Sequence, residues 1–506
     1  MYNENSQCAL TYAFAQAYRY KNVRSSQPPL PTITETELAE LFDVELTKTG
    51  RSPEQVIDLL TKAAEPGLVG NTGPNFFGWV MGASSEVGVA ADLLTSVWGQ
   101  NAGIYKTAPS AAVAEDIAAK WLLNLLDLPR ESSVGFTTGA TMASFIGLAA
   151  ARYDVLRRVG WNIEVDGLQG APQIQIILSE EAHASVHAVL KYLGFGNRHF
   201  TRIPTDKQGR MIISEVEEAA CNANGPAIVI AQAGHINSGA FDHFEELARI
   251  SQAINAWLHI DGAFGLWARS SSTHRSLTKG IDLADSWAID GHKWLQVPYD
   301  SGYAIVRDSQ AHRQAMSIDA SYLNRDPDDG RNPSEYGPEL SRRARGFTTW
   351  AALQSLGSKG LEQMIDRHCQ CAQRLYSQLK TEPGIRILND VCLNQLAITF
   401  TDPRVCKEST QNCRTTDAVI EALQSENKSF VSGADWRGYR IMRVSIISEG
   451  TSDTDIDQLT NSIVAAWRKL SSTLEVQHHP TDNTLRIPSL NRHYDTATGE
   501  RCAARL

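Results

Sequence analysis

A lysine in an apolar setting is the first residue to consider for chemistry. Lys293 stands in Asp290-Gly291-His292-Lys293-Trp294, between the strand-like run Ser286–Ile289 and a second run ending at Val306. Burial disfavours the charged form of an ammonium group and so favours the free amine. Such an amine can form an imine with an aldehyde. The alternative is a surface lysine on a turn, where a lone His-Lys pair is more often found.

An aspartate occupies a similar position. Asp261 follows the strand-like run Trp257–Ile260 and precedes Gly262-Ala263-Phe264-Gly265. In open α/β sheets, ligand-binding residues gather at the carboxyl ends of strands. A carboxylate there can pair with a protonated ring nitrogen, which keeps the ring able to accept electrons. Taken alone, Asp261 is equally well interpreted as the cap of the following turn.

Two further segments suit the binding of an aromatic phosphate. Thr137-Thr138-Gly139-Ala140-Thr141 precedes an expected helix, whose N-terminal amides and dipole favour an anion. His183, in Ser179-Glu180-Glu181-Ala182-His183, begins another expected helix and could stack on an aromatic ring. Each segment alone also fits an ordinary helix start. In chain order the four read as phosphate loop, stacking histidine, ring-nitrogen aspartate and imine-forming lysine, and this ordered set is far more specific than any member.

Short apolar runs that alternate with helical patterns must position these residues. The expected strands are 174–178, 227–231, 257–260, 286–289 and 302–306, and the expected helices between them include 184–193 and 244–255. This alternation predicts βαβ units and a mainly parallel sheet with helices on both faces. Strands at 395–400 and 440–445 with a helix at 417–425 predict a smaller α+β C-terminal domain. Helices are also expected at 34–41, 52–63, 111–126 and 349–380.

Composition excludes several classes of protein. The 506 residues carry 47 basic and 57 acidic side chains, a net charge of −10, which gives no support for nucleic-acid or anionic-membrane binding. No apolar run reaches the roughly 20 residues of a membrane helix. The eight cysteines include no CxxC pair, so we expect free thiols and no metal site.

At this point the sequence resembles the group II amino-acid decarboxylases that depend on pyridoxal 5′-phosphate (PLP), such as the glutamate, aromatic-amino-acid, tyrosine and histidine decarboxylases. The resemblance runs from about Asn75 to Ser448. It is carried by SEEAHASVHAVLKYLGFG, WLHIDGAFG, ADSWAIDGHKWLQVPYDSGYAIV and SRRARGFTTWAALQSLG. It implies the fold of the type I PLP-dependent transferases.

The resemblance also implies a role for each matching residue. Lys293 would hold PLP as a Schiff base, His292 would contact its phosphate, Asp261 would pair with its ring nitrogen and His183 would stack on the ring. The implied cofactor-binding set is Gly139, Ala140, Thr141, His183, Asn237, Asp261, Ala263, Asp290, His292 and Lys293. A tyrosine on a loop would reach the partner subunit's site and protonate Cα after CO2 leaves. Tyr336 is the best match for it and Tyr322 the second.

The chain departs from the family pattern in two places. Asp290-Gly291-His292-Lys293 replaces the common Asn-Pro-His-Lys, so a carboxylate that is neither paired nor turned away would add negative charge beside the phosphate. His235-Ile236-Asn237 lies within the segment that replaces the usual Gly-Thr-Thr stretch. Either His235 or Asn237 is then a candidate for a cofactor or substrate contact.

We expect decarboxylation of an L-amino acid to its amine, with an aromatic substrate favoured. Phe76, Phe77, Trp79 and Tyr105 suggest an apolar pocket lined by aromatic side chains, and Arg343 falls in the arginine motif of the family. The substrate-binding candidates are therefore Phe77, Trp79, Tyr105 and Arg343. Core packing is an alternative role for the aromatic residues. The competing functions are other PLP reactions, namely aldehyde-forming oxidative decarboxylation, transamination or aldol-type cleavage, and a non-catalytic binding protein of the same fold.

The expected organisation follows from these assignments. It comprises an N-terminal segment for dimer and substrate pocket (1–105), a PLP-binding domain (106–310), a catalytic loop and linker (311–348), a C-terminal domain (349–475) and a loosely ordered tail (476–506). The resemblance implies a homodimer with its sites at the interface. We expect a cytoplasmic protein, with the peroxisome as the alternative because Ala504-Arg505-Leu506 resembles an S-K-L address.

Overall fold

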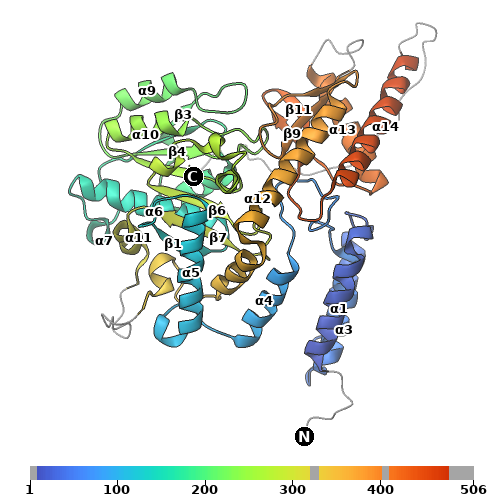
Figure 1. Cartoon of the computed structure of the whole chain (residues 1–506), viewed down its shortest axis with the longest axis horizontal. Coiled ribbons are helices and arrows are strands. Elements are labelled where there is room, and N and C mark those ends of the chain that lie inside the picture. The colour runs from blue at the N-terminus through green and yellow to red at the C-terminus, as the bar shows by residue number, and fades with distance from the viewer. Residues whose placement is uncertain (1–7, 319–329, 402–408, 478–506) are drawn as a thin grey trace, which may run out of the picture.

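A computed structural model describes residues 8–318, 330–401 and 409–477. Figure 1 shows a large α/β domain, a smaller C-terminal domain beside it, and an arm of N-terminal helices that extends away from both. A long helix, α12 (Arg345–Leu379), runs from the large domain to the smaller one. Its backbone leaves the helical conformation at Gly357, where φ is 61° and ψ is 176°.

The large domain is built on a seven-stranded sheet in the order β1-β7-β6-β5-β4-β2-β3. Its strands are β1 (Ser133–Thr137), β2 (Gln175–Ser179), β3 (Phe200–Ile203), β4 (Ala227–Gln232), β5 (Trp257–Asp261), β6 (Ser286–Asp290) and β7 (Gly302–Val306). Neighbouring strands from β3 to β6 are parallel, and only β7 runs antiparallel to its neighbours β6 and β1. β5, β6 and β7 are buried along their whole length, as expected for strands covered on both faces.

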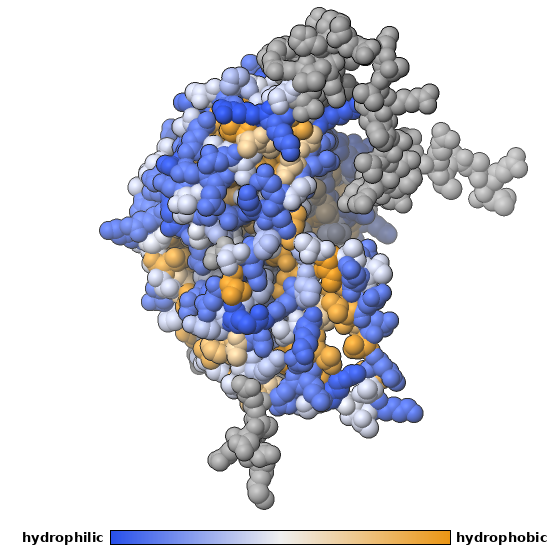
Figure 2. Space-filling view, turned by 90° about the vertical axis from the view of Figure 1, so that its right-hand side faces the viewer, coloured by the Kyte–Doolittle hydropathy of each residue, from blue (hydrophilic) through white to orange (hydrophobic). Residues whose placement is uncertain are grey.

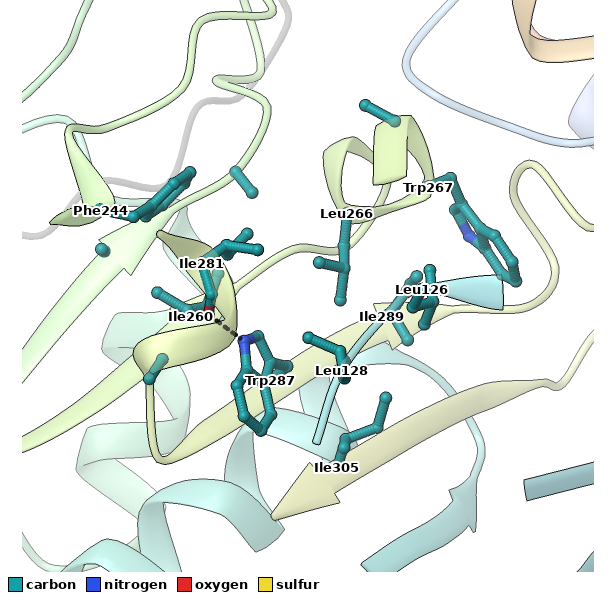
Figure 3. Packing of buried hydrophobic residues seen from close by; sticks show 14 of the residues in the cluster. Leu126, Leu128, Phe244, Ile260, Leu266, Trp267, Ile281, Trp287, Ile289 and Ile305 are labelled. Carbon is teal, nitrogen blue, oxygen red and sulfur yellow. Dashed lines mark hydrogen bonds between the residues drawn. The ribbon is translucent and has the colours of Figure 1, made fainter. Parts of the chain in front are cut away.

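Helices cover the two faces of this sheet. One face packs against α6 (Ala140–Arg158), α8 (Ala184–Tyr192) and α11 (Ser309–Met316), and the other against α5 (Pro109–Leu125), α9 (Ile213–Cys221), α10 (Phe244–Ala253) and the start of α12. The apolar core between the sheet and the helices α5, α9, α10 and α12 contains Trp267 and Trp287 (Figure 3). The indole of Trp287 donates to the carbonyl of Ile281 at 2.8 Å, which satisfies its polar atom inside the core.

The smaller domain has a four-stranded antiparallel sheet in the order β10-β11-β9-β8. Its strands are β8 (Ile385–Ile387), β9 (Gln395–Phe400), β10 (Ser432–Trp436) and β11 (Tyr439–Ser445), and its helices are α13 (Ser409–Glu426) and α14 (Asp453–Gln477). A separate apolar core lies between this sheet, α13, α14 and the second half of α12. The domain is therefore α+β, as the sequence predicts.

The N-terminal helices form the third part of the molecule. The arm consists of α1 (Ala9–Val23), α2 (Glu35–Phe42) and α3 (Pro53–Ala64), and α4 (Glu86–Trp98) packs against α12. Ser52 and Gln55 form a reciprocal capping box at the start of α3, and Thr34 and Glu37 form another at α2. A short α7 (Ile163–Asp166) completes the helices. Among the described helices, none is both long and apolar enough to cross a membrane.

The predicted fold class is confirmed, and most expected elements are present. The predicted strand 395–400 coincides with β9, and the predicted helix 184–193 differs from α8 by one residue. The sequence did not predict β3, β8 and β10, nor the helices α1, α4, α7, α9, α11 and α14. The expected tail (476–506) overlaps α14 at its first two residues, and the rest of it, with Ala504-Arg505-Leu506, lies outside the described residues, as does Tyr322.

Candidate active site

A pocket lies at the carboxyl ends of β4, β5 and β6. It holds about 430 Å³ of empty space, part of it open to solvent. The register places Gln232, Asp261 and Ala288 side by side on adjacent strands, so the loops that follow these strands meet at one edge. The lining residues are Ala140, Thr141, His183, Ser185, Gln232, Gly234, Ile236, Asp261, Ala263, Phe264, Asp290 and Lys293. Seven of the ten predicted cofactor-binding residues are among them.

Lys293 is held beside Asp290. The Lys293 Nζ lies 3.0 Å from Asp290 Oδ2, and His292 Nε2 lies 3.3 Å from Asp290 Oδ1. Asp290 is the last residue of β6 and is only 4% exposed. The Trp267 indole donates to its backbone carbonyl at 2.9 Å and holds this strand end in place. The carboxylate that the sequence leaves in doubt is therefore paired and not turned away.

The start of α6 forms one wall of the pocket. The amide of Ala140, the first residue of α6, donates to Asp290 Oδ1 at 2.5 Å. In the part of the chain that the structure describes, the next two amides, of Thr141 and Met142, donate to no acceptor. Free N–H groups at the positive end of a 19-residue helix favour an anion. This wall suits a phosphate group.

Asp261 is a buried carboxylate that faces the pocket. It is 6% exposed, and the amide of Ala263, 3.2 Å away, is its only hydrogen-bond donor among the described residues. Burial raises the pKa of Asp261, and the charges of His183 and Lys293 counteract this rise. A buried carboxylate without a cationic hydrogen-bond partner is suited to a protonated ring nitrogen. Together with Lys293 and the free amides of α6, it shows that the residues present fit PLP.

His183 lies at the opening of the pocket, where it caps α8. Its Nδ1 accepts the amide of Ser185 at 3.3 Å and lies 2.7 Å from the Ser185 hydroxyl. Although solvent reaches the residue, the pocket walls desolvate its ring and lower the pKa of His183. A neutral imidazole at this position can cover an aromatic ring.

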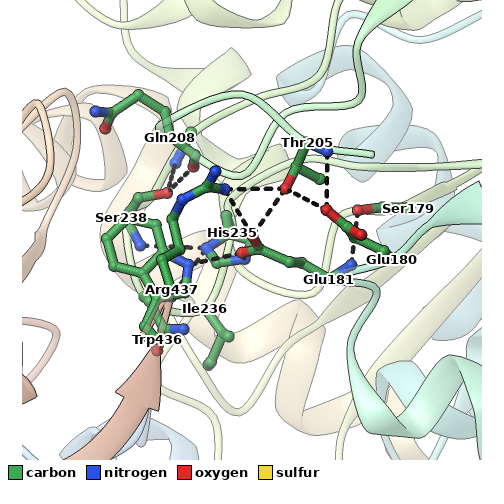
Figure 4. A network of polar contacts seen from close by, with 12 residues as sticks. Ser179, Glu180, Glu181, Thr205, Gln208, His235, Ile236, Ser238, Trp436 and Arg437 are labelled. Atoms are coloured by element: carbon green, nitrogen blue, oxygen red, sulfur yellow. Dashed lines mark hydrogen bonds and ion pairs between the residues drawn. The ribbon is translucent and has the colours of Figure 1, made fainter. Parts of the chain in front are cut away.

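His235 and Asn237 do not line the pocket. The backbone amides of Asn237 and Ser238 donate to His235 Nδ1 at 3.2 and 3.3 Å, so the proton is assigned to Nε2. Nε2 lies 3.0 Å from Glu181 Oε2 (Figure 4), and Glu181 does not line the pocket either. The two residues beside His235, Gly234 and Ile236, line the pocket instead. The structure therefore gives His235 a different partner from the cofactor or substrate suggested by the sequence.

Arg443 is a residue that sequence analysis missed. It lies on β11 of the smaller domain, is 7% exposed, and donates to the carbonyl of the pocket residue Ile236 at 2.8 Å. Its Nε has no hydrogen-bond partner, and no described carboxylate lies within ion-pair distance. Burial lowers the pKa of Arg443 to about 10. Its position between the apolar residues Met442 and Val444 of a strand could have marked Arg443 as a buried cation. Sequence alone, however, does not place that strand beside the pocket.

Tyr336 lies away from the pocket of its own chain. Its ring packs edge-on against His312 at 5.2 Å and beneath the guanidinium of Arg331 at 4.1 Å. Its backbone carbonyl accepts a hydrogen bond from His312 Nε2 at 3.2 Å. Within one chain these contacts hold Tyr336 at β1 and α11.

The four predicted substrate residues also lie outside the pocket of a single chain. Phe77 is fully buried in the core of the smaller domain, while Trp79 is 51% exposed and packs on Phe430. The amide of Tyr105 donates to Asn332. Arg343 pairs with Asp92 on α4 at 2.6 Å. Phe77 and its neighbour Phe76 are therefore buried in packing contacts, the alternative that the sequence left open, whereas Trp79 is half exposed.

The described residues contain no group of three or more His, Cys, Asp or Glu side chains arranged to hold a metal ion. Cys369 and Cys371 are buried free thiols, and burial raises the pKa of the Cys371 thiol to about 11. These thiols are therefore held in their protonated, unreactive form at neutral pH.

Comparison with known proteins agrees with this geometry. Residues 36–400 match the family described as the pyridoxal-dependent decarboxylase conserved domain. The chain is 26% identical over 459 residues to an aromatic-L-amino-acid decarboxylase of Bacillus atrophaeus, covering 89% of this chain and 93% of that protein. It is also 26% identical over 461 residues to the acidic amino acid decarboxylase GADL1 of Mus musculus, covering 88% and 81%.

Solved structures show the same fold. The chain superposes on Oryza sativa TDC, solved with PLP and tryptamine, with a TM-score of 0.86 and 19% identity over 93% of this chain and all of that one. Mouse CSAD gives a TM-score of 0.83 and 22% identity over 90% and 98%. The 4-hydroxyphenylacetaldehyde synthase of Rhodiola rosea gives 0.82 and 20% over 92% and 100%.

Proposed function

Because this chain belongs to the pyridoxal-dependent decarboxylase family, we propose that it converts an aromatic L-amino acid to the corresponding amine and CO2. Family membership makes it a PLP-dependent carboxy-lyase that acts on an amino acid. The choice of substrate and product is the proposal. It is supported by the pocket lining, in which Lys293 is the only lysine or arginine among the described lining residues. An acidic amino acid carries a carboxylate on its side chain, and a second cation in the pocket lining would be needed to bind it.

The residues of the pocket have separable tasks. PLP, when bound, supplies an aromatic ring that accepts the electron pair left when the bond to the carboxylate breaks. Lys293 provides the amine for the cofactor aldehyde, and Asp261 holds the proton on the ring nitrogen. The amides of Thr141 and Met142, with His292, provide the phosphate site. His183, at the opening of the pocket, would cover the ring and exclude water from it.

Arg443 is the best candidate to bind the substrate α-carboxylate. Its guanidinium touches the pocket wall through Ile236 and retains unused donors. A cation behind the pocket wall, together with apolar lining side chains such as Phe264, fits an amino acid with an aromatic side chain. The acidic rival is favoured by the GADL1 relative, which matches at the same identity as the aromatic decarboxylase.

The proton donor to Cα remains a prediction from the resemblance. We propose that Tyr336 acts in the pocket of the partner subunit of a homodimer, because it lies away from the pocket of its own chain. A Tyr336→Phe variant tests this role: we expect loss of amine formation and, with dissolved O2 as the oxidant, aldehyde in its place together with CO2, ammonia and H2O2. Unchanged amine production would remove Tyr336 from the mechanism. The cytoplasmic location also stays a prediction.

A single experiment tests the reaction and the substrate. The purified holoenzyme and a Lys293→Ala variant are compared by absorbance and then incubated with single L-amino acids. We expect an imine band near ~420 nm that is absent from the variant, together with CO2 and amine from an aromatic substrate. Turnover of glutamate or aspartate alone would overturn the aromatic assignment. Aldehyde or keto acid in place of amine would overturn simple decarboxylation.

A further inference from the structure

One carboxylate behind the pocket joins the two domains. Glu181 Oε2 accepts the indole N–H of Trp436 at 2.6 Å and lies 3.0 Å from His235 Nε2. Glu181 Oε1 accepts Arg437 Nη1 at 2.9 Å and the hydroxyl of Thr205 at 2.8 Å (Figure 4). Its partners therefore come from the loops after β3 and β4 and from the smaller domain.

The contacts from the smaller domain come from the tip of one hairpin. Trp436 ends β10, Tyr439 begins β11, and the two residues between them, Arg437 and Gly438, have φ of 52° and 78°. Two central residues with positive φ make the tight turn that suits a two-residue hairpin. Trp436 is 5% exposed, and Arg437 also donates to the carbonyl of Asp206 at 2.6 Å. The hairpin tip is thus docked into the large domain.

Glu181 is connected to two walls of the pocket. It lies two residues before His183, in the segment between β2 and α8. Its partner His235 lies between Gly234 and Ile236, which line the pocket. Because backbone amides fix the Nδ1 side of His235, its Nε2–H is directed to Glu181. A shift of the hairpin tip would therefore displace both walls together.

We propose that Glu181 is a positioning residue through which the β10–β11 hairpin of the smaller domain holds His183 and the Gly234–Ile236 wall in place. The His183 part of this inference rests on the proposed function, whereas the physical coupling does not. Glu181 is suited to the task because hydrogen bonds from His235, Trp436 and Thr205 outweigh the effect of burial and lower the pKa of Glu181 to about 2. The carboxylate stays ionised over the working range of pH and can accept from all its donors.

Backbone hydrogen exchange tests the coupling without any turnover. Trp436→Phe removes the indole N–H and keeps a ring against His235, and Glu181→Gln removes the charge. Arg440→Gln is the matched control, because Arg440 lies in the same hairpin and its ion-pair partners among the described residues are Asp417 and Asp435, both in the smaller domain. We expect exchange in segments 179–186 and 233–238 to rise at least about fivefold in the first two variants and to be unchanged in the control. No rise in Trp436→Phe would overturn the proposal.

Turnover by the holoenzyme tests the consequence for the pocket. We expect Glu181→Gln and Trp436→Phe each to lower kcat/KM about tenfold, and the double variant to lose little more than Glu181→Gln alone. Additive losses would show that the two residues act independently and would overturn the coupling. If no amino acid is decarboxylated even by the unaltered protein, the proposed function fails, while hydrogen exchange still decides the role of Glu181.

Discussion

Asp290 places a buried carboxylate among the groups that would bind the cofactor. Its carboxylate touches three groups that PLP needs, namely the first amide of α6, His292 and the amine of Lys293. The ammonium group and the helix N-terminus offset its negative charge while the pocket is free. A phosphate bound at the same helix end would add negative charge close to Asp290. The Lys293 amine, once bonded to the aldehyde, would no longer offset the charge of Asp290 as a free ammonium group does. The aspartate should therefore oppose cofactor binding.

An Asp290→Asn variant should bind PLP more tightly. The amide oxygen still accepts from Ala140, while the charge beside the phosphate is lost, and we expect the affinity to rise about tenfold, or ~1.4 kcal/mol. Titration of the cofactor-free protein, followed by absorbance, measures the change. Asp285→Asn is the matched control, because Asp285 also accepts a backbone amide, that of Leu258, but lies away from the pocket. Weaker binding by Asp290→Asn would show that the carboxylate supports the site.

The sequence was sufficient to predict the pocket residues whose side-chain chemistry suits the cofactor. Lys293, Asp261 and His183 each follow an apolar strand, and the carboxyl ends of parallel strands meet at one edge of the sheet. The direction of a side chain within a loop was not predictable in the same way. His235 is turned to Glu181 by two backbone amides that form only in the folded loop. Phe77 is drawn into the core of the smaller domain, which is built mainly from residues some 300 positions later.

At the scale of elements, two glycines let α6 approach the sheet. Gly139 precedes α6, and Gly302 begins β7 directly beside it. A Cβ atom on Gly302 would lie 2.5 Å from the Cα of Gly139, and one on Gly139 would lie 2.9 Å from His292 Cε1. These distances are too short for a side chain, so the helix N-terminus can reach the pocket only with glycine at both positions.

A Gly302→Ala substitution should push the start of α6 away from the pocket. Because the obstacle is backbone and cannot move like a flexible side chain, we expect a loss of about 1–3 kcal/mol in stability and at least tenfold weaker PLP binding. Thermal unfolding and cofactor titration measure the two effects. Gly360→Ala is the control, since its Cβ would meet only the Leu356 side chain at ordinary contact distance. Equal cofactor affinity in both variants would contradict this explanation.

Elements were predictable where apolar runs are continuous. β4 and β7 are buried and almost entirely apolar, so their runs stand out from the flanking turns. β10 and β8 did not stand out, because β10 is only partly buried and β8 is three residues long. The helix 349–380 was predicted, but its start at Arg345 was not, because Arg342 and Arg345 read as a polar loop and are in fact buried. Arg342 is neutralised by Glu115, which lies far away in sequence.

At the scale of the whole molecule, buried histidines make stability depend on pH. His259, His312 and His368 are fully buried, and burial lowers the pKa of each to about 3. Below the unfolded value of about 6.5, the unfolded chain binds protons that the folded chain does not, so stability falls as pH falls. Each histidine contributes about 2 kcal/mol of this loss between pH 6.5 and 5.

We therefore expect the protein to melt at a markedly lower temperature at pH 5 than at pH 7. The three histidines together cost about 6 kcal/mol. Burial raises the pKa of Asp242 to about 6, which acts in the opposite direction but returns only about 1 kcal/mol over this range. Calorimetry at a series of pH values measures the slope. A His312→Gln variant should lose about a third of it, and an unchanged melting temperature at pH 5 would refute the account.

The N-terminal helices expose an apolar surface that a single chain leaves uncovered. On α4, Val89, Leu93 and Val97 are 40%, 43% and 58% exposed and recur every fourth residue, so they form one stripe. On α1, Phe14 and Tyr18 are each 59% exposed. Apolar side chains also appear between polar ones on the lower half of the face in Figure 2, where the N-terminal arm lies. An exposed apolar stripe such as that on α4 is typical of an interface.

A homodimer that covers α4 should dissociate when this stripe is charged. Leu93→Asp would bury a carboxylate in an apolar interface, and the cost of several kcal/mol exceeds what most interfaces can absorb. We expect sedimentation to show a dimer for the unaltered protein and a monomer for the variant, with decarboxylation lost because Tyr336 can no longer reach the partner subunit. Val165→Asp is the control, since Val165 is 77% exposed on α7 of the large domain. A folded Leu93→Asp variant that remains dimeric would place the interface elsewhere, and an active monomer would show that one chain suffices for the reaction.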